Sequence, residues 1–201
     1  MHPVVPALMW LPTAGFLLWR SLVWDRSIGV LQAMGVGGFA LISWTLTEYL
    51  LHRYFFHFKG EKPWQRRLQF LFHGLHHDDP VDPTRLVMPP VVALILGGAF
   101  YTLFRSTLGL KWGEPFFAFF VLGYLWYDYT HYAIHCMNVP LLTKTRVGKM
   151  LKKNHMLHHF SNDESRWGVS SPLWDLVFKT NETPPGVLRA GNKKLNMKEA
   201  G

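Results

Sequence analysis

The stretch SIGVLQAMGVGGFALISWTLT, residues Ser27–Thr47, contains 21 residues and no charged side chain. At a rise of about 1.5 Å per residue, an α-helix of this length can cross a hydrocarbon core of about 30 Å. Glu48 follows at once, and the first of several clustered histidines, His52, comes four residues later. We therefore expect a membrane helix that runs directly into a polar, histidine-bearing segment.

Three more apolar stretches surround this one. Pro3–Trp19 has neither a basic start nor a small-residue cleavage site, which favours a membrane helix over a signal peptide. Leu86–Phe104 is uncharged but contains Pro89 and Pro90, so we expect its start to be a bend or loop. Pro115–Tyr127 is apolar before polar residues intervene, which suggests a helix whose far end leaves the hydrocarbon. We predict an all-α, multi-pass protein with about four membrane helices rather than a soluble protein with buried helices.

The composition supports this class. Hydrophobic residues make up 49% of the chain and charged residues 17%, against about 25% in a soluble domain. The formal net charge is +8, but the basic residues fall in particular loops and in the tail, so we do not expect a nucleic-acid partner. Cys136 is the single cysteine, which excludes an intrachain disulfide.

The basic residues also predict an orientation. If four helices span, the segments after the second and fourth helices lie on the same side as the amino terminus. Residues 53–85 contain six Lys and Arg and the segment after residue 143 contains eleven, whereas the opposite loops contain four. Cytoplasmic loops carry such an excess, so we expect a cytosolic helical cap on a bacterial inner membrane or endoplasmic reticulum protein. We expect residues 1–182 to form the membrane domain and residues 183–201 a poorly ordered polar tail.

Ten of the eleven histidines fall into four short boxes on the predicted cytoplasmic side, and only His2 stands apart. The boxes read HRYFFH (52–57), HGLHH (73–77), HYAIH (131–135) and HMLHH (155–159). The candidate metal ligands are therefore His52, His57, His73, His76, His77, His131, His135, His155, His158 and His159.

Helical geometry explains most of these spacings. Positions i, i+3 and i+4 share a helix face, so the histidines of each of the last three boxes should converge. His52 and His57 are five apart, about 140° around an α-helix. They can serve one centre only if the helix ends or unwinds between them, and otherwise they face different metals. Ten imidazoles exceed what one tetrahedral ion takes and suit two ions with four or five nitrogen ligands each.

Nitrogen ligands beside a membrane suggest oxygen chemistry on an apolar substrate. Structural zinc sites rarely use so many histidines without cysteine. A pair of irons that activates O2, the co-substrate, would instead attack an acyl chain that enters from the bilayer. Zinc can replace iron after purification, because it binds such ligands more tightly. A metal or haem carrier is the non-enzymatic alternative, but we expect a carrier to spread its sites along a path through the membrane.

Acidic and phenolic side chains near the boxes are candidate partners of the imidazoles. Glu48 lies four residues before His52, and Asp128 lies three before His131. An acidic residue near the end of a membrane helix is costly unless it has a partner, so Asp128 is a functional candidate, with a solvated interfacial carboxylate as the alternative. Further candidates are Asp78, Asp79, Tyr124, Tyr127 and Tyr129, although tyrosines are also common at membrane interfaces.

The order of the four boxes resembles the fatty acid hydroxylases of the fatty acid hydroxylase/sterol desaturase superfamily, and most closely the fatty acid 2-hydroxylases. The resemblance covers about residues 45–180. It includes the segments EYLLHR (48–53), FHGLHH (72–77), RLVMPP (85–90), YDYTHY (127–132) and GVSSPLWDLVF (168–178).

This resemblance implies a helical membrane domain with two metal ions held by the ten boxed histidines. It also implies that Tyr124, Tyr127 and Asp128 lie close to the metals as catalytic residues. The reaction would be hydroxylation at C2 of a free fatty acid or a sphingolipid N-acyl group. Some members carry a fused cytochrome b5 domain, for which 201 residues leave no room. The electron donor is therefore expected to be separate, such as cytochrome b5 or ferredoxin.

Two positions depart from the family pattern. Cys136 stands where a second histidine often follows the third box, and Lys179 stands where glycine is common. Both leave the ligand set intact but bear on the substrate. A carotenoid ring hydroxylase or a sterol hydroxylase or desaturase is the nearest alternative enzyme. A carotenoid hydroxylase would lack the segment Arg85–Pro90.

Overall fold

The computed structural model describes residues 2–182, and every regular element in that range is helical. The predicted polar tail, residues 183–201, lies outside the described residues. The chain divides into two compact units. The first unit comprises residues 1–46 and 83–132, and the second comprises residues 47–82 with the chain from residue 133 onward.

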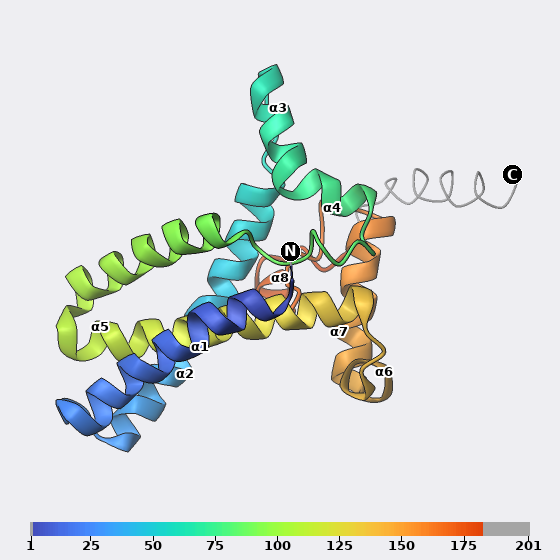
Figure 1. Cartoon of the computed structure of the whole chain (residues 1–201). Coiled ribbons are helices and arrows are strands. Elements are labelled where there is room, and N and C mark those ends of the chain that lie inside the picture. Colours follow the sequence, from blue (N-terminus) through green and yellow to red (C-terminus); the bar gives the residue numbers. More distant parts are fainter. Residues whose placement is uncertain (1, 183–201) are drawn as a thin grey trace, which may run out of the picture. The chain divides into compact units, whose positions relative to one another are not determined.

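The first unit consists of long helices (Figure 1). Helix α1 (Val4–Trp19) continues into the π-helical segment η1 (Arg20–Trp24), and α2 (Val30–Leu50) begins in this unit. Helix α5 (Pro90–Cys136) bends back on itself at Gly109, where φ is 72° and ψ is 174°. Glycine adopts such a positive φ without steric cost. The two arms of α5 correspond to the third and fourth predicted stretches, and the helix begins at Pro90, after the predicted bend.

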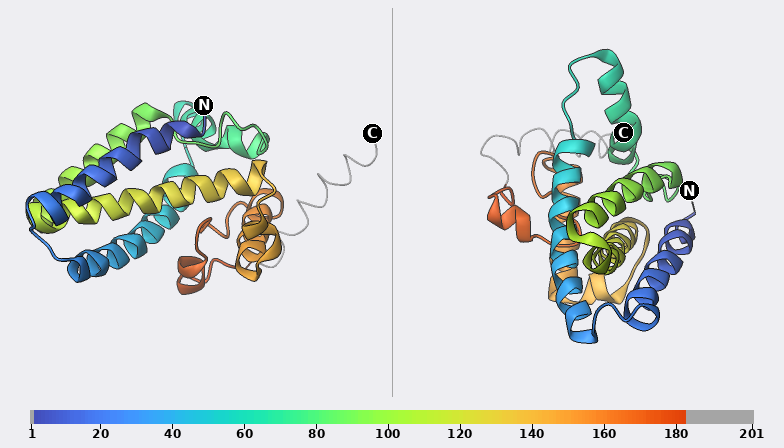
Figure 2. Two further views of the ribbon diagram at one scale, coloured as in Figure 1. Left: turned by 60° about the horizontal axis from the view of Figure 1, so that its bottom comes forward. Right: turned by 90° about the vertical axis from the view of Figure 1, so that its left-hand side faces the viewer.

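The helices of the first unit run alongside one another (Figure 2), and aromatic rings from different helices contact each other. Trp10 of α1 packs edge-on against Phe117, with ring centroids 6.0 Å apart, and Trp44 of α2 packs against Phe120 at 5.1 Å. Glycines make room for the indoles, because a Cβ on Gly97 would lie 2.2 Å from Trp10 and one on Gly123 would lie 2.8 Å from Trp44. The core of the first unit is therefore held by shape-matched apolar packing.

A buried carboxylate that pairs with a partly exposed arginine interrupts this apolar core. Arg20 Nη1 lies 3.2 Å from Glu114 Oε1, and the Tyr101 hydroxyl donates to the same oxygen over 3.1 Å. Glu114 is 2% exposed, so its charge requires partners inside the protein. This pair was not predictable from the sequence, because its two members are far apart in the chain.

Two helical stretches, Val30–Phe56 and Pro90–Cys136, are long and apolar enough to cross a membrane. Large apolar side chains are exposed on both, among them Leu31 and Met34 on α2 and Val91 and Ile95 on α5. These features suggest a membrane protein, because soluble proteins rarely expose so much contiguous apolar surface.

The second unit is built from short elements. After the π-helical segment η2 (Leu51–Phe56), the chain forms α3 (Pro63–Gln69), η3 (Phe70–Gly74) and α4 (Leu75–Asp78). The later elements are α6 (Pro140–Lys144), α7 (Arg146–Phe160) and α8 (Leu173–Val177). Thr145 caps α7 by accepting a hydrogen bond from the amide of Gly148. A Cβ on Gly148 would lie 2.0 Å from the carbonyl of Leu141, so glycine permits α6 and α7 to touch.

Candidate metal centre

The first histidine box lies where the helix that begins as α2 changes its winding. Leu51–Phe56 is π-helical, and the amide of His57 donates to the carbonyl of His52 over 3.2 Å. This i to i+5 bond is that of a π-turn, which brings residues five apart onto one face. The rings of His52 and His57 are 5.2 Å apart. Of the two alternatives left open by the sequence, the structure shows the first, because both side chains face one centre.

Five histidines of the second unit form one compact group, which we call the first histidine group. Their candidate ligand atoms all lie within 4.8 Å of one another. The Nε2 atoms of His57 and His158 are 3.2 Å apart, and those of His73 and His77 are 3.1 Å apart. The members of the group are His52, His57, His73, His77 and His158.

Four more histidines of the second unit form the second histidine group. The Nε2 atom of His155 lies 2.8 Å from that of His135 and 3.0 Å from that of His159. Its members in this unit are His76, His135, His155 and His159. The two groups adjoin, because the rings of His77 and His159 stack with centroids 4.2 Å apart.

Each HxxHH box is divided between the two groups. In the second box His73 and His77 belong to the first group and His76 to the second. In the fourth box the assignment is reversed, since His155 and His159 belong to the second group and His158 to the first. The i, i+4 pair of each box therefore stays together, and the i+3 histidine serves the neighbouring group.

The nitrogen atoms are spaced as ligands of an ion would be. Ligands about 2.1 Å from a metal at right or tetrahedral angles lie about 3.0–3.4 Å from each other. The observed Nε2 separations run from 2.8 to 3.2 Å. Lone pairs at this distance repel one another, whereas a shared cation makes the same arrangement favourable. Nε2 of His52 is buried without a hydrogen-bond partner among the described residues, as expected for a free ligand atom.

The protonation state of the imidazoles also suits metal binding. Burial, reinforced by repulsion from neighbouring histidines, lowers the pKa of both His57 and His76 to about 2. Burial lowers the pKa of His77 to about 4. These rings are therefore neutral at neutral pH, and neutral imidazole is the form that binds metals.

A backbone segment, residues 165–170, fixes two imidazoles of the first group, and we call it the strap. Nδ1 of His52 lies 2.6 Å from the carbonyl oxygen of Trp167, and Nδ1 of His158 lies 2.7 Å from that of Ser165. A carbonyl only accepts, so both Nδ1 atoms carry the proton. The Nε2 lone pairs of these rings are therefore left for a metal.

The strap is in turn held by two buried carboxylates. Glu48 accepts from the amides of Val169 and Ser170 over 2.6 and 2.8 Å, and Asp175 accepts from those of Trp167 and Gly168 over 2.9 and 2.8 Å. We expected Glu48 to orient an imidazole directly, but its carboxylate binds backbone amides instead. The role of Asp175 was missed, and its only sequence signal is an acidic residue inside the apolar run LWDLVF.

The remaining candidates on α5 lie in the first unit. His131 lies on α5 in the first unit, one turn before His135, and stacks on Tyr127 with centroids 5.9 Å apart. Tyr124 and Asp128 are buried in the same unit, and the Tyr124 hydroxyl and Asp128 Oδ2 have no hydrogen-bond partner among the described residues. Tyr129 donates to the carbonyl of Pro3, which gives it a place in the fold.

Asp78 and Asp79 were also candidate partners of the imidazoles. Both are exposed, and within residues 2–182 neither forms a hydrogen bond or an ion pair with a boxed histidine. Burial lowers the pKa of the His77 imidazole, but the charge of Asp78 nevertheless acts on this ring and opposes the larger lowering.

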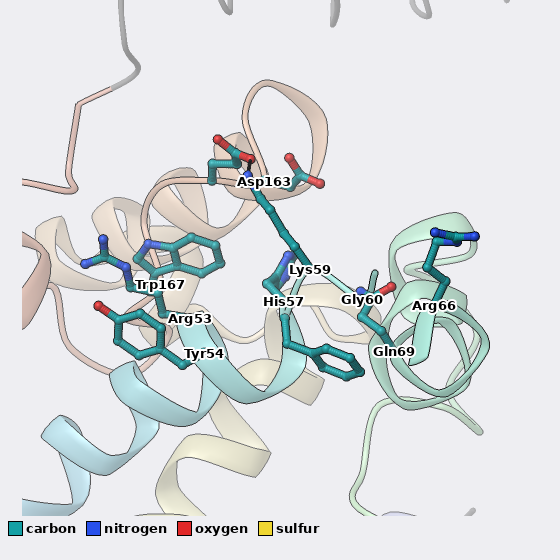
Figure 3. Close-up of a pocket in the computed structure, with 11 residues that line it drawn as sticks. Arg53, Tyr54, His57, Lys59, Gly60, Arg66, Gln69, Asp163 and Trp167 are labelled. Carbon is teal, nitrogen blue, oxygen red and sulfur yellow. Dashed lines mark hydrogen bonds and ion pairs between the residues drawn. The ribbon is translucent and has the colours of Figure 1, made fainter. Parts of the chain in front are cut away.

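A pocket of about 730 Å³ borders the first histidine group (Figure 3). His57 and Trp167 form part of its wall, and their rings pack against each other with centroids 4.9 Å apart. Charged side chains form much of the rest, and Lys59 pairs with Glu164. The lining residues are Arg53, Tyr54, His57, Phe58, Lys59, Gly60, Arg66, Gln69, Asp163, Glu164 and Trp167.

Comparison with known proteins extends this picture. The model of the fatty acid hydroxylase family matches residues 38–180. Dihydroceramide fatty acyl 2-hydroxylase FAH1 of Arabidopsis thaliana is 36% identical over 176 residues, which cover 87% of this chain and 71% of that protein. The fatty acid 2-hydroxylase of Homo sapiens is 35% identical, over 86% of this chain and 50% of its own length.

A solved structure shows the same fold. The structure described as full-length scs7p, with only the hydroxylase domain visible, superimposes with a TM-score of 0.83 at 34% sequence identity. It covers 94% of this chain, which spans 69% of the solved one. With the histidine groups, the family match and these relatives in agreement, the chain belongs to the fatty acid hydroxylase family.

Proposed function

We propose that this protein is a membrane di-iron oxygenase that hydroxylates C2 of a fatty acyl chain, either a free fatty acid or a sphingolipid N-acyl group. The observation that carries the proposal is the pair of adjoining histidine groups in a chain of this family. The relatives named above as 2-hydroxylases support the position of the new hydroxyl group.

We assign five ligands to each ion. The first ion is held by the first histidine group. The second ion is held by the second group together with His131, because His131 lies one turn before His135 on α5 and therefore on the same helix face. When bound, a pair of irons supplies the oxidation of an unactivated carbon–hydrogen bond by O2. The protein holds the imidazoles neutral and correctly oriented and keeps water from the buried rings.

Two residues of α5 are proposed to act on the substrate or on protons, and a third to orient a metal ligand. The Tyr124 hydroxyl can donate to a carboxyl or amide oxygen of the lipid, and Asp128 Oδ2 can take up or release a proton. Both atoms are buried and unpartnered among the described residues, which supports these roles. Tyr127 stacks on His131 and is proposed to fix the orientation of that ring.

We propose that α1, α2 and the two arms of α5 span the membrane, with the histidine boxes and a cap of short helices on the cytoplasmic side. The excess of basic residues in the segments that carry the boxes supports this orientation. Reporter fusions after residues 26, 62 and 110 should read outside, inside and outside. An external reading at 62 would overturn the orientation.

This placement bears on which carbon reacts. A metal site at the membrane face lies level with the polar head of a lipid, whereas mid-chain carbons lie about 10 Å or more deeper in a core of about 30 Å. C2 of an acyl group is therefore the most accessible carbon, while its tail remains among the helices. A carotenoid ring or a sterol is the alternative substrate.

Electrons are proposed to come from a separate donor such as cytochrome b5 or ferredoxin. The pocket beside His57 is lined by charged side chains of both signs, among them Arg53 and Asp163, together with aromatic rings such as that of Trp167. We assign it to the solvent side of the site, where a donor can approach the first histidine group.

Lipid mass spectrometry tests the proposal. A host that expresses the protein should accumulate lipids heavier by one oxygen, and fragmentation should place that oxygen on C2. The matched control is the same host with His73→Ala protein at equal abundance. A hydroxyl in mid-chain, on a sterol or on a carotenoid ring would contradict the substrate assignment while leaving the oxygenase assignment in place.

A further inference from the structure

Two buried carboxylates in the second unit touch no imidazole but hold the backbone that does. Glu48 is 3% exposed and Asp175 is 2% exposed. Between them they accept hydrogen bonds from four consecutive backbone amides, those of residues 167–170. Burial of a carboxylate is unfavourable unless hydrogen-bond donors offset its loss of solvation. The four backbone amides supply such donors to both carboxylates.

We infer that Glu48 and Asp175 are positioning residues for the first metal, acting through the strap on His52 and His158. The inference rests on the proposed metal site. It adds a selectivity, since both imidazoles that the strap carbonyls bind belong to the first histidine group. Loss of either carboxylate should therefore weaken the first metal and leave the second in place.

The backbone of the strap packs closely against the residues that follow it in the chain. A Cβ on Gly168 would lie 2.0 Å from the carbonyl of Ser171 and 3.0 Å from Asp175 Oδ2, so the chain passes close to its own next turn. The Thr180 hydroxyl donates to Asp175, and the Thr180 carbonyl accepts from the amide of Arg166. Asp175 therefore ties both ends of this region together, and Glu48 ties it to the helix that bears His52.

The two carboxylates differ in the partners of their individual oxygens, so we expect amide substitutions to affect them differently. Glu48 Oε1 takes both backbone amides, while Oε2 takes only the hydroxyl of Ser170. A hydroxyl can accept as well as donate, so the amide nitrogen of a glutamine could replace Oε2. Both oxygens of Asp175 accept from backbone amides, so an asparagine would set its own NH2 group against a backbone N–H.

The test is a zinc titration of the full-length protein in detergent, in competition with a chelator. The wild type should bind about two zinc ions with similar resistance to the chelator. Glu48→Ala and Asp175→Ala should lower the affinity of one site by about 10–100-fold, the usual effect of losing a group that orients ligands. Glu48→Gln should keep both sites at wild-type affinity, whereas Asp175→Asn should behave as Asp175→Ala.

Two controls give the result its meaning. Glu114 is equally buried but lies in the first unit, and Glu114→Ala should lose thermal stability while keeping both zinc sites. Adding His159→Ala to Glu48→Ala should weaken the remaining site. Two wild-type affinities in both alanine variants would overturn the inference, and so would an equal loss in Glu114→Ala. If the alanine variants do not fold, the contrast between the isosteric Glu48→Gln and Asp175→Asn decides. A wild type that binds no zinc would contradict the metal site itself.

Discussion

Different kinds of buried residue stabilise the two units of this protein. Buried residues of the first unit are mainly aromatic and aliphatic, such as Phe117 and Ala118, at 3% and 0% exposure. The most buried residues of the second unit include His155 and His158, both at 0%. The first unit thus gains stability by removing apolar surface from water. The second unit buries polar groups, and the desolvation free energy of these groups is offset only by specific hydrogen bonds or bound ions. The comparison teaches that the aromatic core and the first histidine group lie in different parts of the chain, so we expect the loss of one to leave the other largely in place.

The largest expected effect is the loss of one metal ligand. His158→Ala should reduce hydroxylation to less than about one hundredth of the wild-type rate, a larger loss than the about 10–100-fold typical of residues behind the ligands. The protein should still accumulate in the membrane, because the packing of the first unit does not involve this residue. Product formation per mass of membrane protein measures the effect, with His2→Ala as the matched control. A variant that kept most of its activity would remove His158 from the ligand set.

The second largest effect is expected from removal of the metals, which should destabilise the second unit more than the first. The second unit buries neutral imidazoles whose lone pairs face one another, so it should open when no ion compensates them. Hydrogen exchange in chelator should rise across residues 47–82 and 133–182 and change little across residues 83–127. At 100 times its dissociation constant, each restored ion should add about 2.7 kcal/mol to the free energy of unfolding. Equal exchange in both units would show that they are not independent.

A smaller effect, of the opposite kind, is expected from the apolar core. Trp44 packs against the rings of Phe120, Tyr124 and Tyr127. Trp44→Ala should cost about 3–5 kcal/mol of unfolding free energy, the usual penalty for deleting a buried aromatic ring. The folded fraction should nevertheless keep the metal of the first histidine group, whose ligands all lie in the second unit. If Trp44→Ala lost this metal while its unfolding free energy stayed at the wild-type value, the proposed division between the units would be wrong.

The helices and histidine boxes were predictable because both signals are local. An uncharged run such as Ser27–Thr47 predicts a long helix by itself, and a box such as 73–77 shows its ligands within two turns. Each of the four predicted apolar stretches contains a helix in the structure, although residues 86–89 of the third precede the start of α5. The bend at Pro89 and Pro90 was also visible, because proline restricts the residue before it.

The arrangement of the site was harder to predict, because it depends on non-local or backbone contacts. The sequence of residues 51–56 does not predict a π-turn, yet this turn allows His52 and His57 to face one centre. The strap acts through carbonyl groups, which every residue possesses, so Ser165 and Trp167 carry no distinctive signal. Glu48 was recognised by its spacing from His52, but its true partners are more than 100 residues away in the chain.

The central claim, that two adjoining histidine groups each hold one metal ion, is tested most directly by metal analysis of anaerobically purified protein. We expect about two iron atoms per chain in the wild type, and about one in each of His57→Ala and His159→Ala, which remove ligands from different groups. We expect the double variant to retain almost none. One metal per chain in the wild type, or the loss of both metals in each single variant, would contradict two separate sites.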